Sequence, residues 1–149
     1  MKERKIMPFD KNFVPALRFA VMSDIHIDDE DCIEEQRFAK ALDDLKNLCS
    51  SDERYSGFDA LVIVGDFASR GSEIQMRKVK KILDAGLPAD VRLIMTMASH
   101  EYMTDGEENA LRRFDEIFGL TPDTHAVING FDFIAVTTTG GCHFDDKKR

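Results

Sequence analysis

Cysteine is scarce in this sequence, and no pairing pattern is present. The chain has three cysteines, Cys32, Cys49 and Cys142. An odd number without CxxC spacing supports neither a disulfide framework nor a zinc knuckle. Free thiols are typical of a reducing compartment, so we expect a cytoplasmic protein.

Long apolar runs are also missing. A helix needs about 20 consecutive apolar residues to span a bilayer, and no segment approaches that length. The basic start of the chain resembles the head of a signal peptide, but Pro8, Asp10 and Lys11 interrupt the apolar core that would have to follow. The sequence therefore predicts neither a membrane span nor a secretion signal.

Positive charge is in short supply. The 20 Lys and Arg residues against 28 Asp and Glu give a formal net charge of -8. Such an acidic chain argues against binding nucleic acid through a basic patch. A phosphate-bearing ligand would need a local cation, such as a metal ion. The length of 149 residues, with 43% hydrophobic and 32% charged residues, is typical of one soluble globular domain.

What the sequence does contain is a set of apolar runs that end in side chains able to bind a metal. In chain order these are 19–23 followed by Asp24 and His26, 61–64 followed by Asp66, and 91–97 followed by Ser99, His100 and Glu101. The run at 61–64 is mostly β-branched, which is typical of a strand that is covered on both faces in a parallel sheet. Ligands bind at the carboxyl ends of such strands.

Amphipathic segments separate these runs. Apolar residues follow helical spacing between 38 and 49, between 74 and 83 and between 110 and 118. Capping boxes at Ser72–Gln75 and Thr104–Glu107 predict the starts of the second and third helices.

Two further strands are expected near the end of the chain. Asn129-Gly130, between the apolar runs 126–128 and 131–136, predicts a hairpin. The fold class is therefore α/β, with βαβαβα units on a mostly parallel sheet plus a β-hairpin. Right-handed crossovers would bring the three strand ends to one edge. We expect an amino-terminal arm at 1–16 and one domain at 17–149.

Carboxylates and imidazoles that converge from separate loops suit divalent transition metals. Asp24 and His26 are two residues apart, so in an extended segment both side chains can point the same way and chelate one ion. Asp66 can bridge that ion to a second one. Two ions about 3.5 to 4 Å apart lower the pKa of a shared water and clamp a phosphoryl group. A metal-bound hydroxide would then attack without a nucleophilic side chain.

These residues resemble the calcineurin-like metallophosphoesterase family. Asp24-Ile25-His26 is similar to its D-x-H motif, the segment 65–71 to its GD motif with a following glycine, and 98–101 occupies the place of its G-N-H-[DE] motif. Three ordered motifs at three successive strand ends are specific, and the resemblance covers roughly residues 19–136. It implies the first half of the family's α/β sandwich and activity on phosphomonoesters or phosphodiesters.

The resemblance also implies roles for individual residues. Asp24 and His26 would bind the first metal, Asp66 would bridge both, and Ser99 stands where the family has a ligand of the second metal. His100 would act as a general acid or phosphate contact, oriented by an acidic partner. Arg70 would bind the substrate phosphate, since guanidinium binds it bidentately. The ions would be divalent, two in a complete protein: Mn, Fe, Zn or Ni.

Two departures keep a second interpretation open, in which the chain binds metal but is catalytically deficient or serves as an interaction module. Ala98 and Ser99 replace the glycine and asparagine of the third motif, and serine is the weaker ligand. The family also supplies further histidines after the position of Arg149, so we expect a domain that is incomplete at the carboxyl end. His125 and His143 lack the flanking residues of those motifs.

Half a sandwich would leave an apolar sheet face exposed, which predicts self-association or a complementary partner. A receiver-type signalling domain is a third interpretation, based on the strand 58–66. That class needs an acidic pair after its first strand, and Asp24-Ile25-His26 fits it poorly.

Overall fold

The computed structural model describes residues 12–51, 53 and 55–138. Most of the expected amino-terminal arm at 1–16 lies outside the described residues, as do Cys142 and His143. The elements are β1 (Phe19–Met22), α1 (Ile33–Ser50), β2 (Ala60–Val64), α2 (Glu73–Gly86), β3 (Arg92–Thr96), the short 3-10 helix η1 (Ser99–Tyr102), α3 (Glu107–Phe118), β4 (Thr124–Ile128) and β5 (Phe131–Ala135).

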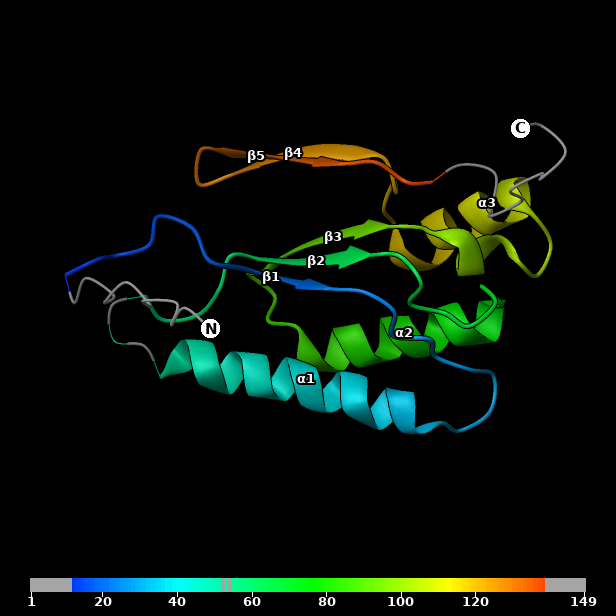
Figure 1. Cartoon of the computed structure of the whole chain (residues 1–149), viewed down its shortest axis with the longest axis horizontal. Helices are drawn as coiled ribbons and strands as arrows, with labels where there is room; N and C mark the ends of the chain where they lie inside the picture. The colour runs from blue at the N-terminus through cyan, green and yellow to red at the C-terminus, as the bar shows by residue number, and fades with distance from the viewer. Residues whose placement is uncertain (1–11, 52, 54, 139–149) are drawn as a thin grey trace, which may run out of the picture.

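The central sheet has three strands in the order β1-β2-β3, and both pairs are parallel. All three strands therefore finish at the same edge, on the right in Figure 1. This confirms the predicted βαβαβα arrangement. One further bridge, between Ile27 and Ala68, joins the loops beyond β1 and β2. The two loops thus continue side by side past the end of the strands.

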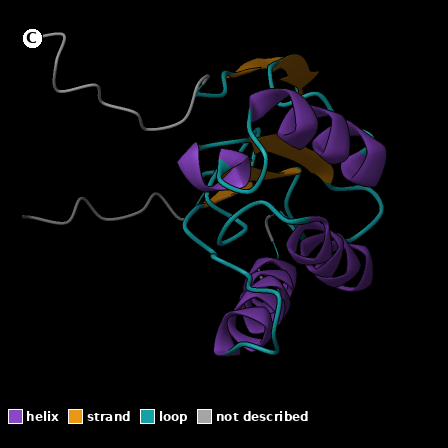
Figure 2. Cartoon of the chain, turned by 90° about the vertical axis from the view of Figure 1, so that its right-hand side faces the viewer, coloured by secondary structure: helices purple, strands orange, loops and turns teal. Residues whose placement is uncertain are grey.

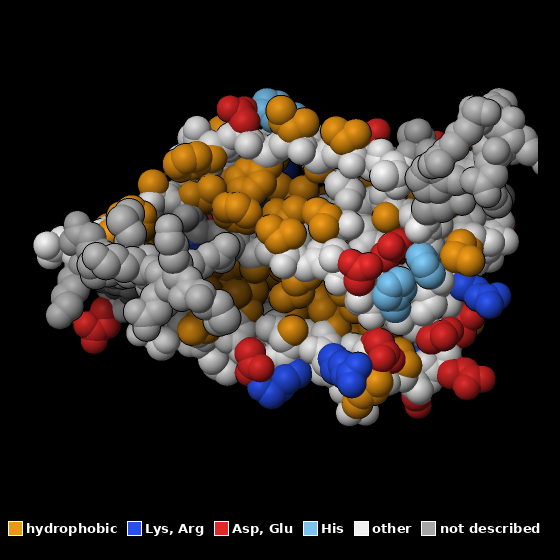
Figure 3. All heavy atoms as spheres, viewed as in Figure 1, with side chains coloured by type: hydrophobic (Ala, Val, Ile, Leu, Met, Phe, Trp, Pro, Cys, Tyr) orange, Lys and Arg blue, Asp and Glu red, His pale blue; other side chains and the backbone are white. Residues whose placement is uncertain are grey.

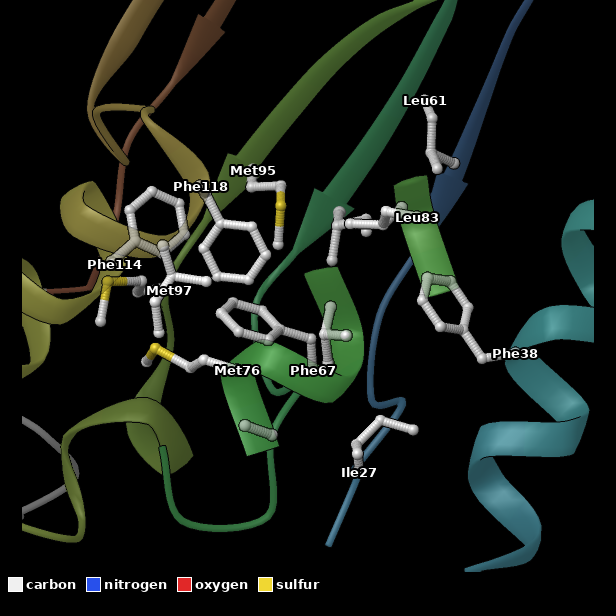
Figure 4. Close-up of a cluster of buried hydrophobic side chains, with 14 of the residues drawn as sticks. Ile27, Phe38, Leu61, Phe67, Met76, Leu83, Met95, Met97, Phe114 and Phe118 are labelled. Carbon is white, nitrogen blue, oxygen red and sulfur yellow. The ribbon is translucent and has the colours of Figure 1, made fainter. Parts of the chain in front are cut away.

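Helices α1 and α2 cover one face of this sheet, as Figures 1 and 2 show. The core between these helices and the sheet is apolar and includes Leu61 and Ile63 of β2, both fully buried. Phe67, in the loop after β2, packs against Phe114 and Phe118 of α3, with ring centroids 6.2 and 5.7 Å apart (Figure 4). The loop that follows the predicted functional strand is therefore anchored by large buried side chains.

The opposite face of the sheet is only partly covered. The hairpin β4-β5 forms a separate antiparallel sheet that contacts β3. Phe19, Val21 and Val64 remain 49%, 55% and 45% exposed. Figure 3 shows apolar side chains across the middle of this view. Parallel sheets normally have both faces covered, so this surface is unusual for an isolated domain.

Turn and cap chemistry explains where several elements begin and end. Ser72 and Gln75 form the predicted capping box at the start of α2. Asn129 and Gly130 turn the hairpin with φ of 51° and 84°, as their sequence predicts. The capping box predicted at Thr104 is wrong. Helix α3 begins after Gly106 without a side-chain cap, because the Thr104 hydroxyl donates instead to the Arg70 carbonyl, at 2.7 Å.

Among the described residues, no helix combines enough length with enough apolar character to cross a membrane.

Candidate metal centre

Left-handed backbone marks the strand ends. The described non-glycine residues with positive φ are Asp24 (53°), His26 (56°), Asp66 (49°) and the hairpin residue Asn129. Such conformations are costly and concentrate where the surrounding structure forces them, often at functional sites. Three of the four residues are those that the sequence assigned to metal binding. The backbone geometry thus independently singles out the same loops.

Side chains from all three strand ends converge at one point. One ligand atom from each of His26, Asp66 and His100 lies within 4.8 Å of the other two. The rings of His26 and His100 meet edge to face, with centroids 4.6 Å apart. In Figure 3, two histidine side chains lie side by side among acidic ones at the right-hand end. All three residues are half-buried, so the cluster is open to solvent.

The ring of His100 is fixed by the loop after β2. Its Nδ1 lies 2.7 Å from the carbonyl oxygen of Ser69. A carbonyl only accepts hydrogen bonds, so Nδ1 carries the proton and donates, which leaves Nε2 to bind an ion or hold a proton. Metal-binding histidines commonly donate their other N–H in this way. The partner is a carbonyl and not the acidic side chain that the family resemblance implies.

Asp24 stands at the rim of the cluster. Its side chain is 68% exposed, and its Oδ1 lies 3.9 Å from His26 Nε2. The expectation of an extended segment is wrong, because both residues have positive φ. The left-handed backbone, with the hydrogen bond from His26 N–H to the Asp66 carbonyl at 3.1 Å, brings His26 to the cluster.

Ser99 and Arg70 are close in sequence to residues of the cluster, to His100 and Asp66 respectively. Ser99 is the first residue of η1 and is half-buried. Arg70 is exposed and follows Ser69, whose carbonyl holds His100. The residue before Ser99, Ala98, has φ of -130°, so its Cβ brings no backbone strain. A Cβ added at Gly65 would overlap Ala98, and the second and third motifs therefore pack closely.

Glu101 is among the metal-capable residues that follow the run 91–97, but the sequence assigned it no role in the site. It is fully buried and accepts three backbone N–H groups, from Asp66, Ala68 and Ala98, at 2.9, 3.0 and 2.8 Å. Burial raises the pKa of the Glu101 carboxyl, and the three donors oppose that rise. Its position directly after His100 is the feature of the sequence that could have identified it as a site residue.

The donor set suits a divalent transition metal. Two imidazoles and a carboxylate are typical ligands of Zn²⁺ and Fe²⁺. Asp66 uses Oδ1 to accept the N–H of His100 at 3.1 Å, so its second oxygen remains for an ion. The residues present therefore fit the group that the sequence predicts.

Comparison with known families gives a match that covers most of the chain. The model of the calcineurin-like phosphoesterases matches residues 17–147. The chain belongs to the calcineurin-like phosphoesterase family. A search of curated proteins found no match.

For a calcineurin-like phosphoesterase, the arrangement is coherent. The family supports phosphoric esters as substrates and divalent ions as cofactors, and the cluster of His26, Asp66 and His100 provides a candidate site for such an ion. The mixed α/β structure with a parallel three-stranded sheet is consistent with the family's fold.

Proposed function

We propose that this chain hydrolyses phosphoric esters, either monoesters or diesters, with the help of divalent ions held at the carboxyl ends of β1, β2 and β3. The observation that carries the proposal is the convergence of His26, Asp66 and His100 within 4.8 Å. The family match over residues 17–147 supplies the reaction class.

The ions would activate a water molecule and neutralise charge on the phosphoryl group. Within the chain, His26 and Asp66 would hold the first ion, with Asp24 as an additional donor at the rim. Asp66 and Ser99 would serve a second ion. The protonated Nδ1 of His100, fixed on the Ser69 carbonyl, directs its Nε2 toward the cluster. When Nε2 carries a second proton, the imidazolium can donate a hydrogen bond to the phosphate or pass that proton to the leaving group, which leaves the ring neutral.

Arg70 would bind the substrate phosphate. Its side chain is exposed, and it follows Ser69 in the same loop. Both its backbone N–H and its backbone carbonyl are hydrogen-bonded. Its N–H donates to Gln75 Oε1 at 2.8 Å, and its carbonyl accepts from Thr104. A guanidinium on a fixed backbone can bind two oxygens of a phosphate.

A metal-binding domain with impaired turnover is the second candidate. The observation that favours it is Ser99, a weaker neutral ligand than the asparagine of the family motif. The occupancy of a second ion site then decides between the two candidates.

The experiment combines metal content with turnover. The purified protein is loaded with Mn²⁺, Zn²⁺, Fe²⁺ or Ni²⁺ in turn, bound metal is measured by elemental analysis, and hydrolysis of p-nitrophenyl phosphate and its bis ester is followed. We expect at least one ion per chain and metal-dependent hydrolysis. Hydrolysis only in the Ala98→Gly, Ser99→Asn double variant would support the second candidate. A chain that binds no transition metal would sink both.

A His100→Gln variant separates the two roles open to that residue. Loss of turnover with unchanged metal affinity supports contact with the phosphate or leaving group. A loss of metal affinity instead makes His100 a ligand of the ion. Leu83→Ala, on the buried face of α2, is the control for a general loss of stability.

We further propose a cytoplasmic setting and self-association through the exposed face of the sheet. The free thiols of Cys32 and Cys49 support the first. The exposed Phe19, Val21 and Val64 support the second. Sedimentation of wild-type protein against a Val21→Lys variant tests the association, and an unchanged monomer in both contradicts it.

A further inference from the structure

Glu101 occupies an unusual position for a charged side chain. It has no exposed surface, yet it lies at the edge of the sheet where the cluster of His26, Asp66 and His100 is open to solvent. A buried carboxylate is tolerated only when hydrogen bonds replace its lost hydration. The three backbone N–H donors, on Asp66, Ala68 and Ala98, serve that purpose.

The donors come from two different loops. Asp66 and Ala68 belong to the loop after β2, whereas Ala98 ends the segment after β3. Oε2 accepts from Asp66 and Ala98 together, and Oε1 accepts from Ala68. One side chain therefore ties the second motif to the third, at the level where both deliver their ligands.

Asp66 is both a donor and an acceptor in this connection between the loops. The N–H of Asp66 donates to the Glu101 carboxylate, while the N–H of His100 donates to Asp66 Oδ1 at 3.1 Å. Two consecutive residues thus hold Asp66 at its backbone and at its side chain. This double connection fixes the left-handed backbone of Asp66, at φ 49°, and sets which of its oxygens is left for an ion.

Close packing also joins the loop after β2 to Glu101. Gly71, at φ 71°, lies against the backbone of Glu101, and a Cβ added there would overlap the Glu101 carbonyl. The loop from Asp66 to Gly71 therefore wraps around Glu101, and only glycine leaves room for it.

From these contacts we propose that Glu101 is a positioning residue of the metal centre, which holds the loops of Asp66 and His100 in their binding geometry before any ion arrives. The inference rests on the proposed function only in that the cluster binds a divalent ion. Glu101 itself touches neither ion nor substrate.

The test measures Co²⁺ binding by visible absorption and Mn²⁺ binding by calorimetry in wild type, Glu101→Gln, Glu101→Asp and the control Leu83→Ala. Glutamine keeps the size but replaces one acceptor oxygen with a donor. Aspartate keeps the charge but is one methylene too short. Removing such outer partners of a metal site typically weakens affinity by about 10- to 100-fold. We expect that loss, with an altered Co²⁺ spectrum, in both Glu101 variants.

The control distinguishes positioning from stability alone. Leu83→Ala should unfold at lower urea concentration, as the Glu101 variants do, but keep the wild-type affinity and spectrum. Folded Glu101 variants with wild-type affinity and spectrum would overturn the positioning role and leave the proposed function intact. A wild-type protein that binds neither ion overturns both.

A measurement on the wild-type chain covers the case in which the Glu101 variants do not fold. The amides of Asp66, Ala68 and Ala98 should be protected from hydrogen exchange in the metal-free protein and equally protected after Co²⁺ addition. Free exchange of these amides before metal is added would show that the connection is not preformed, which contradicts the proposal.

Discussion

Strand β2 has an aspartate at each end, and the two carboxylates have opposite surroundings. Asp59, before the strand, accepts hydrogen bonds from the Arg18 N–H, the Tyr55 hydroxyl and the Asn129 amide, at 2.7, 2.5 and 2.9 Å. Asp66, after the strand, accepts the N–H of His100 and otherwise faces imidazoles. A saturated carboxylate joins parts of the fold, whereas one with an oxygen to spare can bind an ion.

The same difference appears in the backbone. Asp59 leads directly into β2, and both its N–H and its carbonyl join neighbouring segments, at 2.7 Å to the Arg18 carbonyl and 2.8 Å from the Arg92 N–H. Asp66 is held at positive φ, which is a strained conformation for a residue with a side chain. The amino edge of the sheet thus joins parts of the fold, and the carboxyl edge is where we propose that an ion binds.

Asp66→Asn should have the largest effect on binding. It removes the charged ligand, and we expect metal affinity to fall by more than about 100-fold, beyond the loss typical for outer partners. Stability should change by less than about 1 kcal/mol, because asparagine tolerates left-handed backbone. Calorimetry with Mn²⁺ and urea unfolding measure the two quantities. Wild-type affinity in this variant would contradict the assignment of Asp66.

Asp59→Ala should instead lower the stability and leave metal binding unchanged. The half-buried donors on Arg18 and Tyr55 and the exposed Asn129 amide lose their acceptor, which costs about 1–3 kcal/mol of unfolding free energy, while metal affinity stays at the wild-type value. Tyr55→Phe removes one of the three bonds and serves as the graded control, at about 1 kcal/mol. If Asp59→Ala weakens metal binding as much as Asp66→Asn does, the contrast between the two ends of β2 is wrong.

The sequence was sufficient to predict this contrast in part. An apolar β-branched run that ends in Gly65 and Asp66 is a local pattern, and parallel pairing then determines which edge the carboxylate reaches. The role of Asp59 could not be predicted, because its partners Arg18 and Asn129 are brought to it only by the folded chain. Both aspartates flank the same strand and look alike in the sequence.

The limits at the metal centre have the same origin. Asp24, His26 and Asp66 could be proposed as ligands because strand ends and motif spacing are visible in sequence. Their left-handed backbone was not, since positive φ is expected mainly of glycine. The role of Glu101 could not be predicted, because its burial depends on loops 30 residues or more away in the chain, at Asp66 and Ala68.

Asp24→Asn should have an intermediate effect. The side chain is 68% exposed and lies 3.9 Å from His26, so it contributes charge at the rim and not the centre of the cluster. We expect Mn²⁺ affinity to fall by about tenfold, the lower end of the range for outer partners. A loss as large as that of Asp66→Asn would make Asp24 a full ligand of the first ion, as the family resemblance implies.

The smallest effect concerns the acid stability of the amino edge. Burial acts to raise the pKa of Asp59, but the Arg18 N–H, Tyr55 and Asn129 outweigh it and hold that pKa below its ordinary value of 3.8. A lowered folded-state pKa stabilises the protein above the unfolded pKa, and this contribution is lost as pH falls through the folded value. The stability difference between wild type and Asp59→Asn should therefore be constant above about pH 5 and shrink below about pH 4. In a Tyr55→Phe background, the loss should be smaller and complete at a higher pH, because one of the interactions that lower the folded-state pKa is gone. Urea unfolding at pH 6, 4 and 3 measures this, and a difference that grows on acidification would contradict it.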